Sequence, residues 1–578
     1  MERLAIKLAI FLVSGYTLII TMSRASPYAR ALGAFLASPV SEKAGFIEMR
    51  AGSSAPLTLT PDFQWSQSPI TGLEYDSRKV TPGSLYFAFP GLHADGHNFI
   101  SDAVARGALA VIHEKELASY EDGVLYIRAV NARFAMSPVA HAFYGCPSQH
   151  MGIIGVTGTE GKSTTVYLIY QLLKLMGRKA GFISTVQHGD GIHDKQNPEH
   201  QTTPEAVTIH RLLADMRQNG AEFAVVESSS HGLSVRTNRL GDVDFDVAVM
   251  TNVTHEHLEF HGTWEQYRND KAELFRRLDF SPSAHMKLPS VSTTTHDDDL
   301  PLPSFGVANA DDPSASFFAA ATKRKTYTFS TKGAHADLSL QCLESGADGN
   351  WYEAALGTSG TKLTIRDQLP GAFNAGNVLA SLLAVSNILS VDIQTVAALV
   401  PLLKPVLGRM TTVQYGQPFE VLVDYAHTPS SFETILPPLK ERLTAKGGKL
   451  IMVFGSAGDR DTQKRPVQGE IAARYSDIII LTDEDPRSEQ PMAILEDIAS
   501  GCDRAGTLER EKTLFLITDR PAAIRKAISL AQKGDIVLLL GKGHENSIIY
   551  TDTIVYDEIK EAQTALQEAG YHIAYYEK

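Results

Sequence analysis

The segment GVTGTEGKSTT, from Gly155 to Thr165, decides the fold of this 578-residue chain. The apolar run MGIIGVTG leads into it, and the helical pattern TVYLIYQLLKLMG follows it. A buried strand, a glycine-rich loop and a helix in this order are typical of a phosphate-binding unit, because backbone N–H groups and the helix N-terminus attract anions. The glycine spacing departs from the strict pattern of a glycine, four residues and GK[ST], but the lysine and the serine are kept. We therefore expect an ATP-dependent enzyme.

Three side chains near this loop are candidates for phosphate and metal binding. Lys162 can reach the β and γ phosphates, and the hydroxyl of Ser163 can hold Mg²⁺. Glu227 ends the apolar strand FAVVE, a position from which a carboxylate contacts Mg²⁺ directly or through water. The histidines of TNVTHEHLEFHG (His255, His257 and His261) could suggest zinc, but their spacing matches no common zinc pattern, so we favour magnesium.

The rest of the sequence predicts an α/β protein of three domains, since 578 residues are too many for a single hydrophobic core. The central domain is expected to be a P-loop-type parallel sheet, with an irregular insertion at 281–304. The apolar strands FEVLVDY, KLIMVFG, DIIILTDE and DIVLLLGKG alternate with helical stretches and predict a Rossmann-like C-terminal domain, with ligands at the carboxyl ends of its strands. The expected divisions are an apolar extension (1–48), a first α/β domain (49–150), the central ATP-binding domain (151–405) and the C-terminal domain (406–578).

Composition restricts the class of function. The net charge of -13 argues against a general nucleic-acid binder, which needs a basic surface. The three cysteines (Cys146, Cys342 and Cys502) have neither metal-type spacing nor an even disulfide framework. The small number of cysteines favours a reducing cytoplasm as the location of the protein. We also expect the protein to be a monomer.

One feature conflicts with a cytoplasmic location. The apolar run between Lys7 and Arg24 is shorter than the roughly 18 residues of a membrane span and is similar to a signal-peptide core. Export would separate the enzyme from ATP, so we favour a translation start at Met49, with a membrane anchor as the alternative. A peptide covering Ala5 to Arg24 in mass spectra of the native protein would exclude the Met49 start.

Taken together, several motifs give the chain a family resemblance. It resembles the Mur ligases, most of all the MurE type, which adds the third residue of the peptidoglycan stem peptide. The resemblance runs in unbroken order from about Thr71 to the C-terminus. The motifs are TGTEGKSTT, QTTPE, ESSSHGL, TNVTHEHLEFHG, NADDP, GAFNAGN, GRM, DYAHTP, GDRDTQKRP and GKGHE.

The resemblance implies the chemistry. A substrate carboxylate takes the γ-phosphate of ATP to form an acyl phosphate, and an incoming amine then displaces phosphate to form an amide. Lys271 matches the family lysine that reacts with CO₂ to form a carbamate, which with Ser163, Glu227 and His257 would hold two Mg²⁺ ions. The implied catalytic residues are Lys162, Glu227, His257 and Lys271. The implied ATP-binding residues are Gly158, Thr159, Glu160, Gly161, Lys162, Ser163, Thr164, Asn374, Asn377, Arg409, Asp424, His427 and Lys464.

The implied partners are UDP-N-acetylmuramoyl-L-alanyl-D-glutamate and a diamino acid. Two extra residues before Arg239 leave Arg236 as an alternative for the anion-binding arginine. The positions that match the uridine and peptide contacts are Ser77, His93, Thr202, Thr203, Ser229 and Arg239.

The specificity motif of the family falls at Glu484, Asp485, Pro486 and Arg487, with Arg460, Gly541 and Glu545 as further contacts. Arginine at the fourth position is the meso-diaminopimelate form, since its planar fork binds a carboxylate through two hydrogen bonds. Asp485 replaces the usual asparagine, and if its charge pointed into the pocket it would favour ornithine or lysine. The alternatives to a MurE-type enzyme are another Mur ligase, a folylpolyglutamate synthase and a catalytically silent membrane-anchored scaffold.

Overall fold

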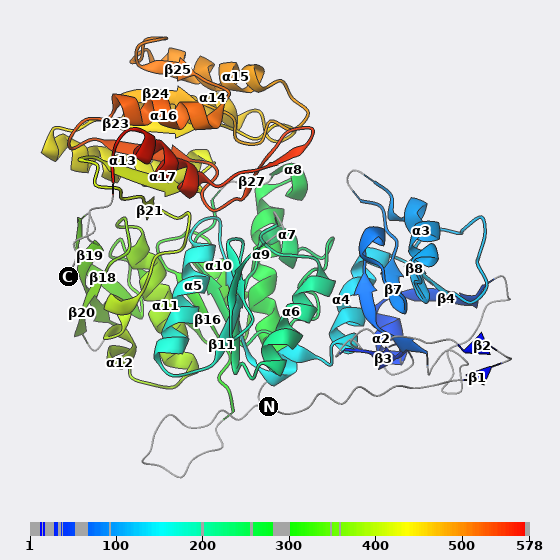
Figure 1. Ribbon diagram of the computed structural model, residues 1–578. Coiled ribbons are helices and arrows are strands. Elements are labelled where there is room, and N and C mark those ends of the chain that lie inside the picture. Colours follow the sequence, from blue (N-terminus) through cyan, green and yellow to red (C-terminus); the bar gives the residue numbers. More distant parts are fainter. Residues whose placement is uncertain are drawn as a thin grey trace. The chain divides into compact units, whose positions relative to one another are not determined.

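The structure of the chain is a computed structural model. It describes residues 12–13, 16–17, 28–32, 36, 38–52, 68–91, 94–197, 201–254, 258–280, 301–346, 349–357 and 360–572. These residues form two compact units (Figure 1). The first unit takes its residues from 1–147, 205–214 and 235–243, and the second contains the remainder. The expected α/β class is confirmed, because each unit combines helices with a largely parallel sheet.

The first unit is built on a five-stranded sheet in the order β4-β9-β8-β7-β6. The central strands are almost wholly apolar and buried, and only β4 runs antiparallel to its neighbour. Helix α4 packs on the sheet through alanine, methionine and valine side chains. The elements are α2 (Ser38–Lys43), β4 (Phe46–Ala51), β6 (Gly72–Glu74), η1 (Ser77–Lys79), β7 (Ser84–Phe87), α3 (Ile100–Ala105), β8 (Ala110–His113), β9 (Leu125–Ala129) and α4 (Ala132–Phe143), with a short pair β3 (Arg30–Ala31) and β5 (Pro69–Ile70).

The boundary expected after residue 48 falls inside β4. In that strand Met49 pairs with Ile127 of β9 and is only 5% exposed. Leu32 and Leu36 belong to the same apolar cluster. A chain starting at Met49 would therefore lack half of an edge strand and part of the core of this unit. The apolar run between Lys7 and Arg24 lies outside the described residues, except for the paired strands β1 (Leu12–Val13) and β2 (Tyr16–Thr17).

A buried histidine of the first unit is expected to make the stability of the protein sensitive to acid. His210 is 0% exposed, and neither ring nitrogen has a hydrogen-bond partner among the described residues. Its ring centroid lies 5.2 Å from that of His141. Burial lowers the pKa of His210 well below the ordinary value of 6.5, because a charged imidazole would lose its hydration. The folded state thus holds the neutral form.

We expect the thermal unfolding midpoint to fall as the pH drops below about 6.5, where the unfolded histidine binds a proton and the folded one does not. One such proton corresponds to about 1.4 kcal/mol per pH unit. His210→Phe should make Tm less dependent on pH between 7.5 and 5.5, whereas the exposed His193→Gln should leave the dependence unchanged. Equal pH dependence in the wild type and His210→Phe would contradict this account.

The second unit contains an eleven-stranded sheet in the order β13-β12-β11-β14-β10-β15-β16-β17-β18-β19-β20. The strands from β11 to β18 run parallel, and antiparallel strands extend both edges. The strands are β10 (Gly152–Thr157), β11 (Ala180–Ile183), β12 (Gln187–Gly189), β13 (Asp194–Gln196), β14 (Phe223–Glu227), β15 (Val247–Met250), β16 (Phe305–Asn309), β17 (Thr326–Ser330), β18 (Leu338–Gly346), β19 (Gly349–Leu356) and β20 (Thr361–Asp367).

Helices α5 and α11 pack together on this sheet, and their apolar side chains form one cluster with the buried strands. The helices are α5 (Lys162–Leu175), α7 (Ser230–Leu233), α8 (Leu258–His261), α9 (Trp264–Arg277), α10 (Ala315–Ala320), α11 (Asn374–Ile388) and α12 (Ile393–Ala397). Helix α6 (Ala206–Gln218) begins in the first unit, which includes residues 205–214, and ends in the second. Of the insertion expected at 281–304, residues 281–300 lie outside the described part of the chain.

The C-terminal region of the second unit has a six-stranded sheet in the order β21-β22-β26-β23-β24-β25. All but β21 run parallel, and apolar clusters cover both faces, so the expected Rossmann-like layering is confirmed. The elements are β21 (Thr411–Thr412), β22 (Glu420–Asp424), α13 (Pro429–Lys446), β23 (Leu450–Phe454), α14 (Lys464–Tyr475), β24 (Ile478–Leu481), α15 (Pro491–Ala505), β25 (Leu514–Leu516), α16 (Arg520–Leu530), β26 (Ile536–Leu540), β27 (Ser547–Ile549), β28 (Thr553–Val555) and α17 (Glu558–Glu568).

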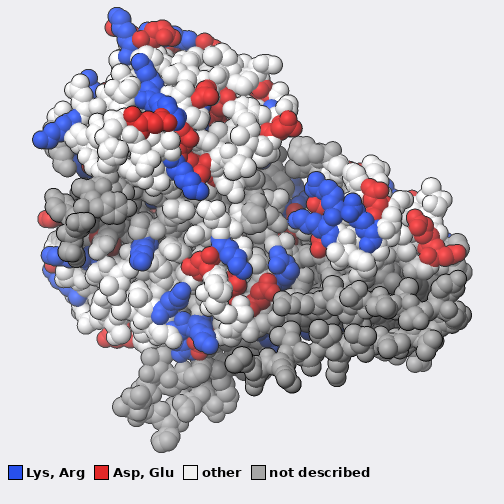
Figure 2. All heavy atoms as spheres, in the orientation of Figure 1, with Lys and Arg blue, Asp and Glu red and all other residues white. Residues whose placement is uncertain are grey.

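On the face drawn in Figure 2, charged side chains lie in small groups of both signs. Figure 2 shows lysine and arginine next to aspartate and glutamate on the visible face rather than one broad basic face. Among the parts of the chain that the structure describes, no helix combines the length and the apolar character that crossing a membrane requires.

Candidate active site

The phosphate loop lies between β10 and α5 and depends on two glycines. Gly158 has φ +155°, and a Cβ there would lie 1.9 Å from the Thr251 hydroxyl oxygen. Gly161 has φ +81°, and a Cβ there would lie 2.5 Å from Oδ1 of Asn377. Only glycine fits both positions. The N–H groups in the first turn of α5 have no acceptor within the helix, so they can bind the phosphates of ATP.

Lys162, Ser163 and Glu227 meet beside this loop. The Ser163 hydroxyl donates to the Glu227 carboxylate at 3.0 Å, which is 1% exposed at the end of β14. Nζ of Lys162 donates to the Thr159 carbonyl at 2.7 Å, so its side chain folds back over the loop. Two oxygen donors beside a phosphate loop fit the ligand preference of Mg²⁺, which binds through one or two carboxylates and substrate phosphates.

Lys271 lies in α9 and is 1% exposed, unlike an ordinary surface lysine of a helix. Its Nζ donates to the Gly158 carbonyl at 2.6 Å and lies 4.5 Å from the Tyr267 ring centroid. The Tyr267 hydroxyl in turn is 3.0 Å from the Thr159 hydroxyl. The fold therefore places this side chain directly against the phosphate loop, although 113 residues of sequence separate it from Gly158.

The histidines of the 255–261 segment fall into two groups. His255 and His257 lie outside the described residues. His261 is 2% exposed, with Nδ1 2.7 Å from the Asp270 carboxylate and Nε2 3.1 Å from the Ser230 hydroxyl. Both ring nitrogens of His261 therefore have protein partners. No group of three histidine, cysteine, aspartate or glutamate side chains able to hold a metal ion occurs among the described residues.

Two asparagines expected to bind ATP stand at the start of α11. Asn377 accepts a hydrogen bond from the Thr165 hydroxyl at 3.2 Å, and its amide donates to Asn374 at 2.9 Å. The amide of Asn374 donates to the Pro370 carbonyl at 2.8 Å. Both side chains are thus fixed next to the phosphate loop and α5.

The other expected ATP contacts come from the C-terminal region. The guanidinium of Arg409 lies 4.8 Å from the Tyr425 ring centroid and donates to the Ser163 hydroxyl at 3.4 Å. Asp424 accepts from the backbone N–H of Ala426 at 2.7 Å, and burial raises the pKa of its carboxyl. Nζ of Lys464 donates to the His427 carbonyl at 3.0 Å. A further link joins the Thr428 hydroxyl to the Glu160 carboxylate at 3.3 Å.

The residues expected to bind the peptide substrate divide between the two units. Thr203 and Ser229 lie in the second unit, 2.9 Å apart through their hydroxyls, and Thr203 also donates to the Glu227 carbonyl at 2.9 Å. Thr202 next to them is half-buried. In the first unit, Ser77 is 8% exposed in η1, and His93 lies outside the described residues.

The two candidate arginines of the first unit differ in environment. Arg239 donates to the Glu205 carboxylate at 2.9 Å, and its side chain is only 12% exposed. Arg133 also contacts Glu205, so one carboxylate stands between two guanidinium groups. Arg236 is exposed.

The motif from Glu484 to Arg487 follows β24 and lies at the carboxyl ends of the C-terminal strands, as expected. Asp485 pairs with Lys542 at 2.9 Å, so its charge is compensated within the protein. Glu484 is 6% exposed, and its Oε2 has no hydrogen-bond partner among the described residues. Burial raises the pKa of Glu484 above the ordinary carboxyl value.

Arg487 has φ +57°, and its guanidinium forms no ion pair within the described part of the chain. Gly541 approaches Glu484 closely, since a Cβ there would lie 2.8 Å from Oε2. The remaining member of the expected set, Arg460, is exposed in the loop after β23.

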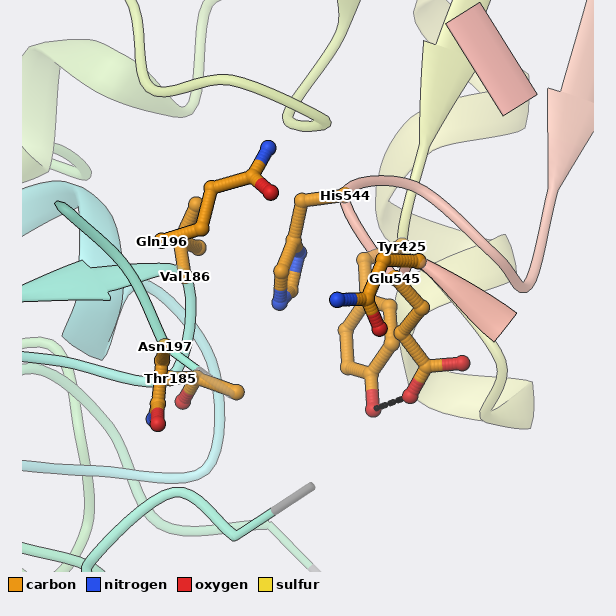
Figure 3. A pocket seen from close by; sticks show the side chains of 8 residues that line it. Thr185, Val186, Gln196, Asn197, Tyr425, His544 and Glu545 are labelled. Carbon is orange, nitrogen blue, oxygen red and sulfur yellow. Dashed lines mark hydrogen bonds between the residues drawn. The ribbon is translucent and has the colours of Figure 1, made fainter. Parts of the chain in front are cut away.

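Glu545, the last residue of the expected amino-acid site, lines a cavity of the second unit (Figure 3). Tyr425 and His544 lie beside Glu545, and Thr185 and Gln196 form the opposite wall. The Tyr425 hydroxyl donates to the Glu545 carboxylate at 3.1 Å.

Sequence reasoning did not identify Thr185, Tyr425 or Lys542 as members of this site. Thr185 donates to Glu227 through its backbone N–H at 2.8 Å and its hydroxyl at 3.0 Å. Tyr425 lies within the motif DYAHTP and Lys542 within GKGHE. Membership of these motifs was the one sequence feature that could have indicated a role for them in the site. No motif marks Thr185.

Comparisons with known proteins match most of the chain. The family model described as "Mur ligase family, catalytic domain" matches residues 69–144, "Mur ligase middle domain" matches 156–287 and 297–385, and "Mur ligase, glutamate ligase domain" matches 408–543. The UDP-N-acetylmuramyl-tripeptide synthetase of Treponema denticola is 48% identical, over 86% of this chain and 94% of that protein.

Two further relatives have names that state an amino acid. The UDP-N-acetylmuramoyl-L-alanyl-D-glutamate–2,6-diaminopimelate ligase of Geobacillus thermodenitrificans is 39% identical, over 86% of this chain and 95% of that protein. A solved structure of an enzyme with this activity superposes with a TM-score of 0.56 at 29% identity, covering 89% of this chain and 98% of that chain.

Proposed function

The chain belongs to the Mur ligase family, and we propose that it uses ATP to join a diamino acid to UDP-N-acetylmuramoyl-L-alanyl-D-glutamate in peptidoglycan precursor synthesis. The observation that carries this proposal is the convergence of Lys162, Ser163, Glu227 and Lys271 on one phosphate loop. Relatives that cover 86% of the chain and are named for this reaction support it. The reaction is expected in the cytoplasm, where ATP is available.

In the proposed reaction, a carboxylate oxygen of the substrate attacks the γ-phosphorus of ATP, and the bond from that phosphorus to ADP breaks. The amine of the diamino acid then attacks the acyl carbon, loses a proton and displaces inorganic phosphate. The main demand is to stabilise negative charge on the moving phosphoryl group. Lys162 and the N–H groups at the start of α5 meet this demand, and bound Mg²⁺ supplies further positive charge.

We propose that Lys271 carries a CO₂-derived carbamate in the active enzyme. The ammonium group first loses a proton. The uncharged amine then attacks the carbon of CO₂, a N–C bond forms as one C–O π bond opens, and a second proton leaves, so overall a cation becomes an anion. The position of the side chain supports this, because Lys271 is 1% exposed and its Nζ contacts the Gly158 carbonyl, so a carbamate there would lie at the phosphate loop. The residues that would hold Mg²⁺ are the carbamate on Lys271, Ser163 and Glu227, with His257 added by the family resemblance.

For the added amino acid we propose meso-diaminopimelate. Its distal carboxylate needs an arginine whose charge is not already paired with a carboxylate of the protein. Arg487 meets this need, because it forms no ion pair within the described part of the chain. Its distal ammonium fits Glu545, whose carboxylate borders the cavity. A second candidate is lysine or ornithine, favoured by the buried Glu484 oxygen that has no partner among the described residues, since an unmatched carboxylate attracts an ammonium group.

Arg487→Ala is expected to raise KM for diaminopimelate by about tenfold to a hundredfold, because a charge-assisted bidentate contact is lost. KM for ATP should stay within about twofold, since Arg487 lies outside the phosphate loop. Steady-state ADP release at saturating uridine substrate measures both. Arg474→Ala removes an exposed arginine of the same domain and should change neither value. An unchanged KM for diaminopimelate in Arg487→Ala would contradict the assignment.

Omission of each substrate in turn tests the proposed function. ADP release should require ATP, UDP-N-acetylmuramoyl-L-alanyl-D-glutamate and a diamino acid together, with one ADP formed per amide. Release with tetrahydrofolate and glutamate instead would favour a folylpolyglutamate synthase. No release with any substrate, from a folded protein that binds the uridine substrate, would favour a silent scaffold.

A further inference from the structure

Lys542 is a buried lysine of the C-terminal region to which the proposed reaction assigns no role. It follows Gly541 after β26, and its side chain is 0% exposed. Its Nζ donates to Asp485 at 2.9 Å and also to Glu545. A buried ammonium group is costly unless its partners compensate the lost hydration. Here two carboxylates from two different loops provide that compensation.

Two hydrogen bonds keep the carboxylate of Asp485 next to Lys542. Its Oδ1 accepts from Lys542 and also from the backbone N–H of Ile549 in β27, at 2.9 Å. Arg487 donates its own backbone N–H to the Ile549 carbonyl at 2.9 Å. The same strand residue thus fixes the carboxylate of Asp485 and the backbone of Arg487, and the Arg487 guanidinium makes no ion pair with Asp485.

Glu545 is held from both sides. One carboxylate oxygen accepts from the Tyr425 hydroxyl at 3.1 Å, and the other accepts from Lys542. Figure 3 shows the first of these contacts at the wall of the cavity, with His544 beside it. Two donors with fixed positions hold the Glu545 carboxylate in one orientation. A substrate ammonium group can then bind to it without reorganisation of the site.

The charges of this cluster do not cancel. Lys542 contributes one positive charge, and Asp485 and Glu545 contribute one negative charge each. Asp485 has a further backbone donor, and of the two carboxylate residues only Glu545 lines the cavity, so we assign the uncompensated negative charge to Glu545. Without Lys542 two carboxylates would face each other across a buried site, and like charges at this distance disfavour each other.

We propose that Lys542 is a positioning residue of the amino-acid subsite: it neutralises Asp485 and orients Glu545, so that the subsite presents one carboxylate to the distal ammonium and leaves Arg487 for the distal carboxylate. This inference rests on the proposed function. It also means that Asp485 does not select against a second carboxylate, although its charge alone predicts that it would.

Kinetics of Lys542→Met test the proposal. KM for the diamino acid should rise by about tenfold or more, while KM for ATP and for the uridine substrate stays within about twofold. Lys440→Met is the matched control, because Lys440 pairs with Asp477 before the start of β24, at the opposite ends of the strands. It should change none of the three values.

Asp485→Asn supplies the second variant, which separates positioning from folding. Added to Lys542→Met, it removes one uncompensated charge and should recover at least about a third of the lost affinity for the diamino acid. Alone, it leaves Lys542 with Glu545 as its one carboxylate partner, so the net negative charge of the cluster is lost and KM for diaminopimelate should rise rather than fall.

Two results would overturn the inference: an unchanged KM for the diamino acid in Lys542→Met, or a rise shared equally by all three substrates. A large fall in KM for diaminopimelate in Asp485→Asn alone would overturn it as well, since it would place the Asp485 charge in the pocket. Failure of the proposed function would be visible separately, as absence of ADP release by the unsubstituted protein with every diamino acid.

Discussion

Lys271→Ala should lose ligase activity by about 10³-fold, and short-chain carboxylates such as acetate or formate should restore part of it. The side chain is 1% exposed and contacts the loop that binds phosphate, so its removal leaves a small cavity beside the reacting groups. A free carboxylate that enters this cavity can replace the oxygen atoms of the proposed carbamate. ADP release at increasing acetate concentration measures the recovery, which should saturate.

Lys560→Ala is the control for this experiment, since Lys560 is an exposed helix lysine with a side chain 79% exposed. It should retain full activity and show no response to acetate. If Lys271→Ala kept the wild-type rate, the carbamate proposal would be excluded. If it folded normally and lost activity with no response to carboxylates, the bond to Gly158 would be the important contact instead.

Lys162→Met should lower kcat by about 10²-fold to 10⁴-fold, because this side chain is expected to neutralise charge on the β and γ phosphates in the transition state. The affinity for ADP should fall less than kcat, since the N–H groups at the start of α5 remain. Single-turnover ADP release and calorimetric ADP binding measure the two effects. Lys174→Met, near the other end of α5, is the control.

A fall of ADP affinity as large as that of kcat in Lys162→Met would assign Lys162 to ground-state binding. An unchanged kcat would remove it from the site. Neither outcome would affect the assignment of Lys271, because the two lysines approach the loop from different helices, α5 and α9.

The sequence predicts the local parts of this fold well. The strand, loop and helix around Gly158 and Gly161 follow from residue order alone, since the apolar run and the glycines act within a few residues. The alternating strands and helices after Gly408 likewise predict the Rossmann-like sheet. The polar residues after each of these strands then had to meet at one edge, because parallel strands share their carboxyl ends.

Other features depend on contacts between distant segments, so the sequence alone did not predict them. The pairing of Met49 with Ile127 places β4 in the first unit, where composition had suggested a boundary. Residues 205–214 and 235–243 join the first unit although they lie inside the expected central domain. From the first of these segments, Ala206, Val207 and Ala214 pack in the core of that unit. At one edge of the sheet, β19 and β20 add antiparallel pairs after β18 without a motif of their own.

The charge of Asp485 illustrates the same limit at the site. Its departure from the family motif was visible in the sequence, but its partner Lys542 lies 57 residues further along the chain. The burial of Lys271 and the support of Glu227 by Thr185 are of the same kind. In each case the residue type indicates what chemistry is possible, and the long-range contact decides how the residue is used.

The most direct test of the central claim is a competition reaction analysed by mass spectrometry. The protein is given ATP, UDP-N-acetylmuramoyl-L-alanyl-D-glutamate and equal concentrations of meso-diaminopimelate, lysine and ornithine. The account predicts one main product, the uridine dipeptide extended by diaminopimelate, formed with an equal amount of ADP. A product carrying only lysine or ornithine would contradict the role given to Arg487, and no amide product at all would contradict the assignment as a ligase of this type.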